Sequence, residues 1–239
     1  MKAVKKFLRS DPKLYVLIGK YPALAVALGI LIGDSIYSSR NLISMAYKVP
    51  EFALLALGMM LAFMSGGIDL SIVANANTAG IFAAFILTGA WFTGLSSGSA
   101  IFIAIIVAIM VSIVFGLLNG FLIGKMSAPP MITTIGNMLF FSGIGMALTG
   151  GKSIVGFPEA FTNIGVATMM GIPAIFIFFI VVAVIFTLIL TFTGFGRKLY
   201  LYGGNKVAAR FSGVNNEHMA IAVYAIIGLF VGLAGLIII

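Results

Sequence analysis

A single carboxylate interrupts a long apolar stretch of this sequence. Asp69 is the only charged residue between Glu51 and Lys125. Around it lie groups that can hydrogen-bond or bend the chain: Gly66, Gly67, Ser71, Asn75 and Asn77. Such residues can contact a polar solute, but catalysis or metal binding would need a cluster of acids, bases or ligands, and the sequence shows none. We therefore expect a site that contacts solute, with no catalytic residue, no metal and no cofactor.

The glycine pair before Asp69 allows two arrangements of the carboxylate. If a helix breaks there, freed backbone amides can hydrogen-bond the carboxylate, and the irregular segment lines a polar cavity. Alternatively, the glycines form a tight turn between two membrane helices, and Asp69 lies among the cytoplasmic headgroups. A charge at the centre of a membrane helix costs about 2.5–3.5 kcal/mol. Either arrangement avoids that cost, so the sequence leaves both open.

More polar groups follow Pro129 and Pro130 inside an otherwise apolar stretch. Thr133, Thr134 and Asn137 either line a solute path or hydrogen-bond across helices. Together with the first group, they give a set of candidate path residues. These are Asp69, Ser71, Asn75, Asn77, Thr134 and Asn137.

Two stretches that imitate known sites are set aside. The letters GGKS at Gly150–Ser153 resemble the end of a phosphate-binding loop, but that pattern requires glycine at position 146, where this chain has Met146. Glu217 adjoins His218, the only histidine, but no further ligands or bases accompany the pair. We interpret the pair as a solvated helix start.

The composition identifies the solvent in which the chain folds. Hydrophobic residues make up 62% and charged residues 8% of the 239, far from the averages of soluble domains. A soluble globule of this size could not bury so much apolar surface, so we predict an integral membrane protein. The net charge of +8 arises from basic clusters beside apolar runs, which are typical of topology signals rather than of nucleic-acid binding.

Runs of about 20 apolar residues predict the membrane crossings. The fold class is all-α, a polytopic helical membrane protein with about seven transmembrane helices. The expected spans are 21–38, 52–69, 71–90, 99–123, 131–149, 173–194 and 219–239. The last run stops without a flanking charge, so we expect a chain truncated at its C-terminus. Gly116, Gly120 and Gly124 repeat on one helix face and predict close helix packing.

The distribution of basic residues predicts the orientation. With the N-terminus inside, the cytoplasmic segments hold eleven Lys and Arg residues, six of them in the basic segment 1–20, and the outer segments hold Arg40, Lys48 and Lys152. This bias favours a cytoplasmic N-terminus. It also places the loop 195–216 in the cytoplasm. There Asn205 can cap a short helix that ends at Gly213, and so small a helix needs a partner surface, either the membrane face or a soluble subunit.

Four blocks of the sequence, in order, carry a family resemblance: GGIDLS (66–71), GLLNGFLIGKMSAPPMITTIGNM (116–138), ALTGGKSI with GFP (147–158) and FGRKLYLYGGNKVAARFSGVN (195–215). They resemble the permease subunits of ribose-type ABC sugar importers, which have about ten spans. The resemblance implies that 1–239 is an incomplete permease domain and that 195–216 is a cytoplasmic coupling loop. Its coupling residues would be Gly204, Asn205, Ala208, Ala209, Arg210 and Gly213.

The resemblance also implies partners and a location. We expect a separate ABC ATPase subunit, an extracytoplasmic sugar-binding protein, a second permease copy as homo- or heterodimer, membrane lipids and no nucleic acid. The location would be the bacterial inner membrane. Two departures stand out: Lys206 and Val207 occupy the place of the family's Pro-Glu, and Ile72 and Val73 replace its Val-Gly after GGIDLS. Any coupling role of that acid is therefore lost here.

Three functions remain for comparison. The leading one is a non-enzymatic permease subunit that imports a monosaccharide such as ribose. A related ABC permease for nucleosides or branched-chain amino acids is the alternative, since its architecture is similar. An ion-coupled secondary transporter would need intramembrane acids in several spans, and only Asp69 qualifies.

Overall fold

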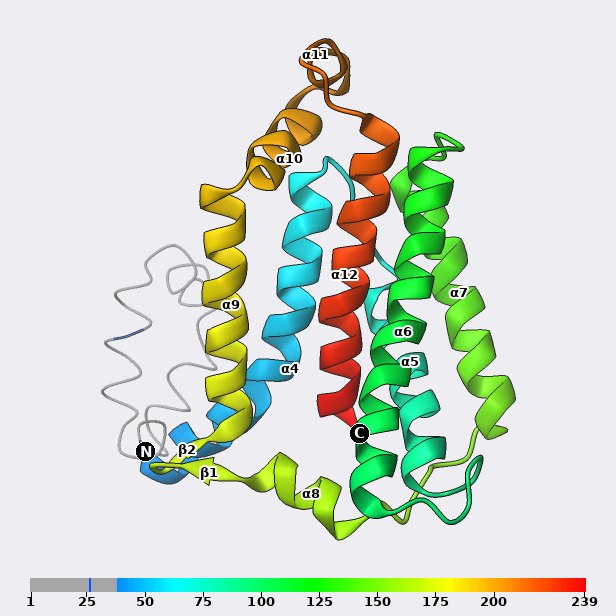
Figure 1. Ribbon diagram of the computed structural model, residues 1–239, viewed down its shortest axis with the longest axis vertical. Coiled ribbons are helices and arrows are strands. Elements are labelled where there is room, and N and C mark those ends of the chain that lie inside the picture. The colour runs from blue at the N-terminus through cyan, green and yellow to red at the C-terminus, as the bar shows by residue number, and fades with distance from the viewer. Residues whose placement is uncertain (1–25, 27–37) are drawn as a thin grey trace, which may run out of the picture. The chain divides into compact units, whose positions relative to one another are not determined.

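A computed structural model describes Val26 and residues 38–239. The predicted span 21–38 and the basic segment 1–20 lie outside the described residues, apart from Val26 and residue 38. The chain divides into two compact units after Lys48, and the account below concerns the second, Val49–Ile239 (Figure 1).

The described chain is almost entirely helical. Its long helices are α4 (Ser39–Met64), α5 (Ile72–Leu87), α6 (Ser97–Gly124), α7 (Pro130–Thr149), α9 (Ala174–Phe192) and α12 (Asn216–Ile238). The shorter helices are α8 (Glu159–Val166), α10 (Gly194–Gly204) and α11 (Lys206–Phe211). Strands β1 (Thr168–Met169) and β2 (Ile172–Pro173) form a small antiparallel hairpin. Among the described helices, five are long and apolar enough to cross a membrane, which confirms a polytopic helical membrane protein.

The predicted spans from 52 onward each fall on one helix, but the first of these was misplaced. The sequence predicted a span at 52–69, whereas α4 covers Ser39–Met64 and includes Arg40 and Lys48. Helix limits follow backbone hydrogen bonding rather than hydropathy, so charged residues can extend a helix beyond its apolar run. At the other end, Gly66 takes a φ of +79°, which stops the helix before Asp69.

Helix α5 is shorter than the predicted span 71–90. Its 16 residues extend about 24 Å at 1.5 Å per residue, less than the roughly 30 Å of a hydrocarbon core. The irregular segment between Met64 and Ile72 precedes it, and this segment packs against the helices that surround it. The crossing predicted at 71–90 therefore combines a non-helical stretch with a short helix.

Helices α6 and α12 form the closest pair in the core. A Cβ on Gly116 would collide with the backbone oxygen of Tyr224, and a Cβ on Gly120 would lie 2.8 Å from the Cα of Ile221. From the other side, a Cβ on Gly228 would lie 2.8 Å from the Cα of Ile113. The predicted packing role of the glycine face is confirmed, because only glycine permits backbones at this separation.

The loops of the second unit gather at two ends. Helices α10 and α11 lie at one end (top of Figure 1), together with the loop between α6 and α7. Helix α8 and the hairpin lie at the other end with the C-terminal end of α12. Five of the six Lys and Arg residues of the second unit share the α11 end: Lys125, Arg197, Lys198, Lys206 and Arg210. The outer faces of the helices stay apolar, as a lipid environment requires; half of the Leu188 side chain of α9 is exposed.

Candidate functional site

The segment between α4 and α5 is a buried helix break. It leaves the helical path at Gly66 and carries Asp69, whose side chain is only 2% exposed. The backbone amide of Ser71 donates to Asp69 Oδ1 at 2.9 Å, and the Ser71 hydroxyl donates to the same oxygen at 2.6 Å. A carboxylate held in this way is not solvated in a surface turn. The hydrogen-bonded helix break of the first arrangement is therefore observed.

The hydrogen bonds continue from the break into two neighbouring helices. Asn119 of α6 donates from Nδ2 to Ser71 Oγ at 2.8 Å. Asn137 of α7 donates from Nδ2 to Asn119 Oδ1 at 2.5 Å. We call the four side chains of Asp69, Ser71, Asn119 and Asn137 the polar chain. It joins the break to α6 and α7 inside an otherwise apolar core, where each member has a partner that offsets its desolvation.

Helix α7 holds the break by a second contact. The hydroxyl of Thr134 donates to the backbone oxygen of Ile68 at 3.2 Å, and Thr134 is fully buried. Asn119 lies five residues before the end of α6 at Gly124, or about 7.5 Å along its axis. The break thus lies between one and two helical turns inside the α11 end of the bundle.

The predicted path residues do not all meet. Asp69, Ser71, Thr134 and Asn137 come together at the break, as described. Asn75 instead donates to the backbone oxygen of Ser112 at 3.2 Å and fastens α5 to α6. The Ser112 hydroxyl in turn donates to the Gly228 oxygen at 2.7 Å, so this second polar junction holds α5, α6 and α12 together.

Asn77 lies apart from both polar groups, on an exposed part of α5. It lines a cavity of about 560 Å³ between α5, α7, the loop that follows α7 and the C-terminal end of α12, which contributes Ile238 and Ile239. We call this cavity the vestibule; it lies toward the end of the bundle opposite α11. Its polar lining comprises Asn77, Thr78, Ser142, Thr149, Lys152 and Ser153.

The loop 195–216 forms the helices α10 and α11 and brings the predicted coupling residues to one exposed tip. The side chain of Asn205 accepts from the amides of Val207 and Ala208 at 2.9 and 3.0 Å, so it caps α11 as predicted. Gly204 ends α10, and Gly213 takes a φ of +80° after α11.

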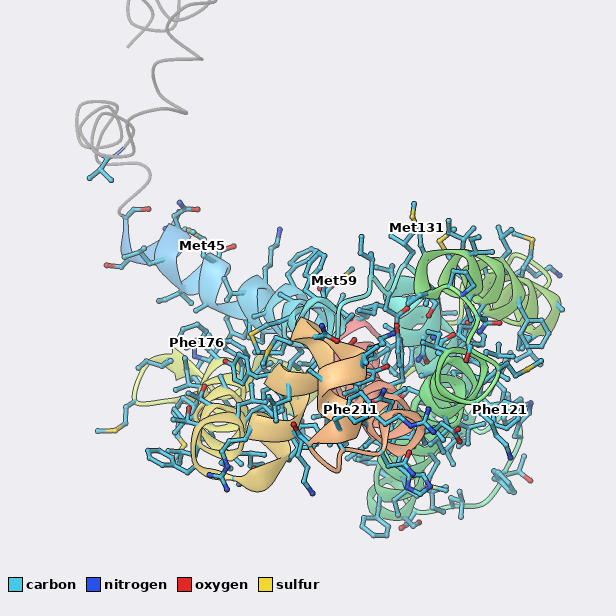
Figure 2. All side chains as sticks on the ribbon, turned by 90° about the horizontal axis from the view of Figure 1, so that it is seen from above. Met45, Met59, Phe121, Met131, Phe176 and Phe211 are labelled. Carbon is cyan, nitrogen blue, oxygen red and sulfur yellow. The ribbon has the colours of Figure 1, made fainter. Side chains whose placement is uncertain are left out.

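The faces of α11 differ in burial. Ala209 is fully buried, whereas Ala208 and Arg210 are exposed. Phe211 is 89% exposed, which is unusual for a large aromatic side chain outside lipid. Figure 2 looks onto this end and shows Phe211 on the tip above the helix bundle. The tip therefore presents an apolar and basic surface.

A backbone contact joins this tip to the break. A Cβ on Gly203 of α10 would collide with the backbone oxygen of Met64, the last residue of α4. A Cβ on Gly66 would lie 3.3 Å from the Gly203 oxygen. The end of α10 thus rests directly on the point where α4 gives way to the break.

Sequence reasoning missed Asn119 and Gly203. Asn119 is the only asparagine of α6, and a lone amide in so apolar a helix is the signal that could have identified it. Gly203 stands next to Gly204, and only Gly203 packs against another backbone. Which glycine of such a pair packs against another backbone depends on tertiary structure.

The sites set aside earlier show ordinary structural roles. Asn215 accepts from the His218 amide at 3.0 Å, so Glu217 and His218 begin α12 as a solvated helix start. The GGKS stretch is an exposed loop at the mouth of the vestibule. Within the described part of the chain, no three His, Cys, Asp or Glu residues are grouped so that they could hold a metal ion.

Comparison with known proteins identifies the family to which this sequence belongs. Residues 41–239 match the family model described as the permease component of the branched-chain amino acid transport system. The ribose import permease protein of Bacillus subtilis is 33% identical over 90% of this chain and 65% of its own length. The D-allose transport system permease protein of Escherichia coli is 30% identical over 90% of this chain and 64% of its own length.

A third relative is named for a different solute. The autoinducer 2 import system permease protein of Salmonella typhi is 30% identical over 97% of this chain and 64% of its own length. The chain therefore spans somewhat less than two thirds of the length of these relatives. No solved structure matches it. The family match covers nearly all of the described residues, and the chain belongs to the family of branched-chain amino acid transport system permease components.

Proposed function

We propose that this chain is the permease subunit of an ATP-driven importer for a small sugar such as ribose. The observation that carries the proposal is the contact between Gly203 and Met64. It connects an exposed tip, suited to a soluble partner, with a buried polar break in the membrane core. A transporter driven by a separate subunit needs such a connection.

The mechanism follows from this contact. A partner ATPase binds α11 and moves it as the partner closes on ATP. Helix α10 carries the displacement to Met64, because two backbones in contact cannot approach further. The break then shifts between two arrangements of the polar chain, since hydrogen-bonded side chains re-pair in discrete steps. Solute passes when the break and its neighbouring helices change position.

The surface of the tip is suited to binding another protein. Phe211 and Val207 supply exposed apolar surface, and Arg210 and Lys206 supply positive charge. Such a mixture suits a groove with an apolar floor and acidic rim in the ATPase subunit. The coupling residues remain Gly204, Asn205, Ala208, Ala209, Arg210 and Gly213, and the permease itself hydrolyses no ATP. With α11 in the cytoplasm, the N-terminus is cytoplasmic as well.

A sugar fits the chemistry of the polar groups. Neutral amides and hydroxyls hydrogen-bond sugar hydroxyls in weak, wet contacts, which allow release as well as binding. The solutes for which the relatives are named, ribose, D-allose and autoinducer 2, favour a sugar over a nucleoside or an amino acid. The other partners would be an extracytoplasmic sugar-binding protein and a second permease copy.

Reconstitution tests the proposal. The chain is placed in lipid vesicles with a candidate ATPase subunit and a candidate sugar-binding protein from the same organism, and uptake of labelled ribose and D-allose is measured. We expect uptake only when ATP is present on the side of the membrane that holds the ATPase subunit. A proton gradient alone should drive no uptake. ATP hydrolysis by the purified chain without its partner would refute the assignment of roles, and uptake driven by a proton gradient would indicate a secondary transporter.

A further inference from the structure

The vestibule contains one charged side chain, Lys152. The other polar groups that line it are neutral amides and hydroxyls, and its apolar lining includes Ile81, Met146 and Phe157. Within the part of the chain that the structure describes, no carboxylate oxygen lies within 4.0 Å of the Lys152 ammonium. Its charge therefore acts on whatever occupies the cavity.

The loop that carries Lys152 is fixed at the end of α7. The amide of Lys152 donates to the Thr149 oxygen at 3.1 Å, and the amide of Gly151 donates to the Thr149 hydroxyl at 3.2 Å. Gly150 and Gly151 have φ values of +59° and +72°, conformations that favour glycine. These turns hold the backbone of Lys152 at the mouth of the cavity.

Membrane topology does not account for this lysine. Basic residues that set orientation collect on the cytoplasmic side, and those of the second unit otherwise collect at the α11 end. Lys152 lies at the opposite end, against that bias. Among the basic residues of the second unit, Lys152 is the one that lines the vestibule.

We propose that the vestibule selects solutes by charge, and that Lys152 is the residue that sets this selectivity. The occupant is a small polyhydroxylated solute that is neutral or anionic, and cationic solutes are disfavoured. This inference rests on the proposed transport function, because it assigns the vestibule to the outer end of the solute path. The hydroxyls of such a solute meet Asn77, Ser142 and Ser153, and Lys152 donates to a hydroxyl or an anionic group.

The chain has no cysteine, so single cysteines can report the electric potential inside the cavity. We choose Asn77→Cys and, as a second lining position, Ser142→Cys. Thr93→Cys is the matched control, because Thr93 is exposed in the loop between α5 and α6 at the same end but does not line the cavity. Cells expressing each full chain are treated from outside with anionic sulfonatoethyl or cationic trimethylammonioethyl methanethiosulfonate. The rate at which each reagent modifies each cysteine is divided by the rate at which the same reagent modifies a small free thiol.

A lysine one Debye length away, about 8 Å at physiological salt, should favour the anionic over the cationic reagent by roughly twofold to threefold. We therefore expect the normalised anion-to-cation ratio to be roughly twofold to threefold higher at positions 77 and 142 than at position 93. Adding Lys152→Gln should bring the ratio to that of the control, and Lys152→Glu should bring it below. Equal ratios at all three positions would overturn the proposal, as would a raised ratio that survives Lys152→Gln.

These rates do not depend on uptake, so the two proposals can fail separately. If the ratios behave as expected but no ATP-dependent uptake is found, the charge selectivity of the cavity stands and the transport function falls. If uptake is found but the ratios are equal, transport stands and the role of Lys152 is refuted.

Discussion

Gly203 of α10 rests on the backbone carbonyl of Met64, so closely that a Cβ on Gly203 would occupy the space of that oxygen. The contact links an exposed helical tip to the break that holds Asp69. Both partners are main-chain groups, so no side-chain rearrangement can absorb a movement between them. We therefore propose that a movement of the tip toward the bundle displaces the break.

Replacing Gly203 with alanine should separate α10 from the end of α4 at Met64. The added methyl group forces α10 away from Met64, and such overpacking costs about 1–3 kcal/mol. We expect Gly203→Ala to lower the thermal unfolding midpoint in detergent, followed by circular dichroism, and to abolish uptake. Gly194→Ala in the same helix is the control, because its Cβ would meet only the flexible end of Arg197 at 4.0 Å. Equal behaviour of the two variants would remove the mechanical link.

Asn119 should be the most sensitive member of the polar chain. It donates to Ser71 and accepts from Asn137, so Asn119→Ala removes one hydrogen bond from the buried Ser71 and one from the half-buried Asn137, at up to roughly 1–3 kcal/mol each. We expect a lower unfolding midpoint and loss of uptake. Asn77→Ala, at an exposed position outside the polar chain, should keep the parent midpoint. An Asn119→Ala protein as stable as the parent would show that the polar chain does not hold the break.

Asp69 should tolerate an amide better than a methyl group. The Oδ1 of Asp69 accepts from both the amide and the hydroxyl of Ser71, and an asparagine oxygen can replace it there. Asp69→Asn should therefore reduce uptake or assembly, and Asp69→Ala should reduce both further and lower the yield of folded protein from membranes. Parent levels of uptake and assembly in both variants would argue for a carboxylate with no role at the break.

A charge on the exposed face of α11 should uncouple the permease. Ala208 is exposed, so Ala208→Asp should leave membrane insertion intact, but it would place a carboxylate in the partner's groove. We expect normal amounts of protein in membranes and little ATP-dependent uptake. Thr93→Asp adds the same charge to an exposed loop at the other end and should retain uptake. Unchanged uptake by Ala208→Asp would remove the coupling role of α11.

The sequence predicted the parts of this structure that depend on composition and spacing. Apolar run lengths located the helices, because backbone groups in lipid must pair within each helix, and the spacing of Gly116 and Gly120 indicated the packing against α12. The α11 cap was predicted from Asn205 alone, because an asparagine side chain accepts hydrogen bonds from the first amides of the helix that follows it.

The remaining parts depend on contacts between distant segments. The early end of α4 results from the conformation of Gly66, and the central position of Asn119 appears only when α6 and α7 flank the break. Asn75 and Asn77 are two residues apart on α5 and therefore face different neighbours: one fastens helices together, and the other lines the vestibule. Spacing alone could not assign these roles.

The central claim is that α11 faces the cytoplasm, where an ATPase subunit can reach it. Ala208→Cys introduces a single thiol on the exposed face of α11, and Thr93→Cys marks the opposite end. Each is labelled with a membrane-impermeant thiol reagent in right-side-out and in inside-out vesicles. The account predicts that Ala208→Cys reacts only in inside-out vesicles and Thr93→Cys only in right-side-out vesicles. Reaction of Ala208→Cys from the outer face would contradict it.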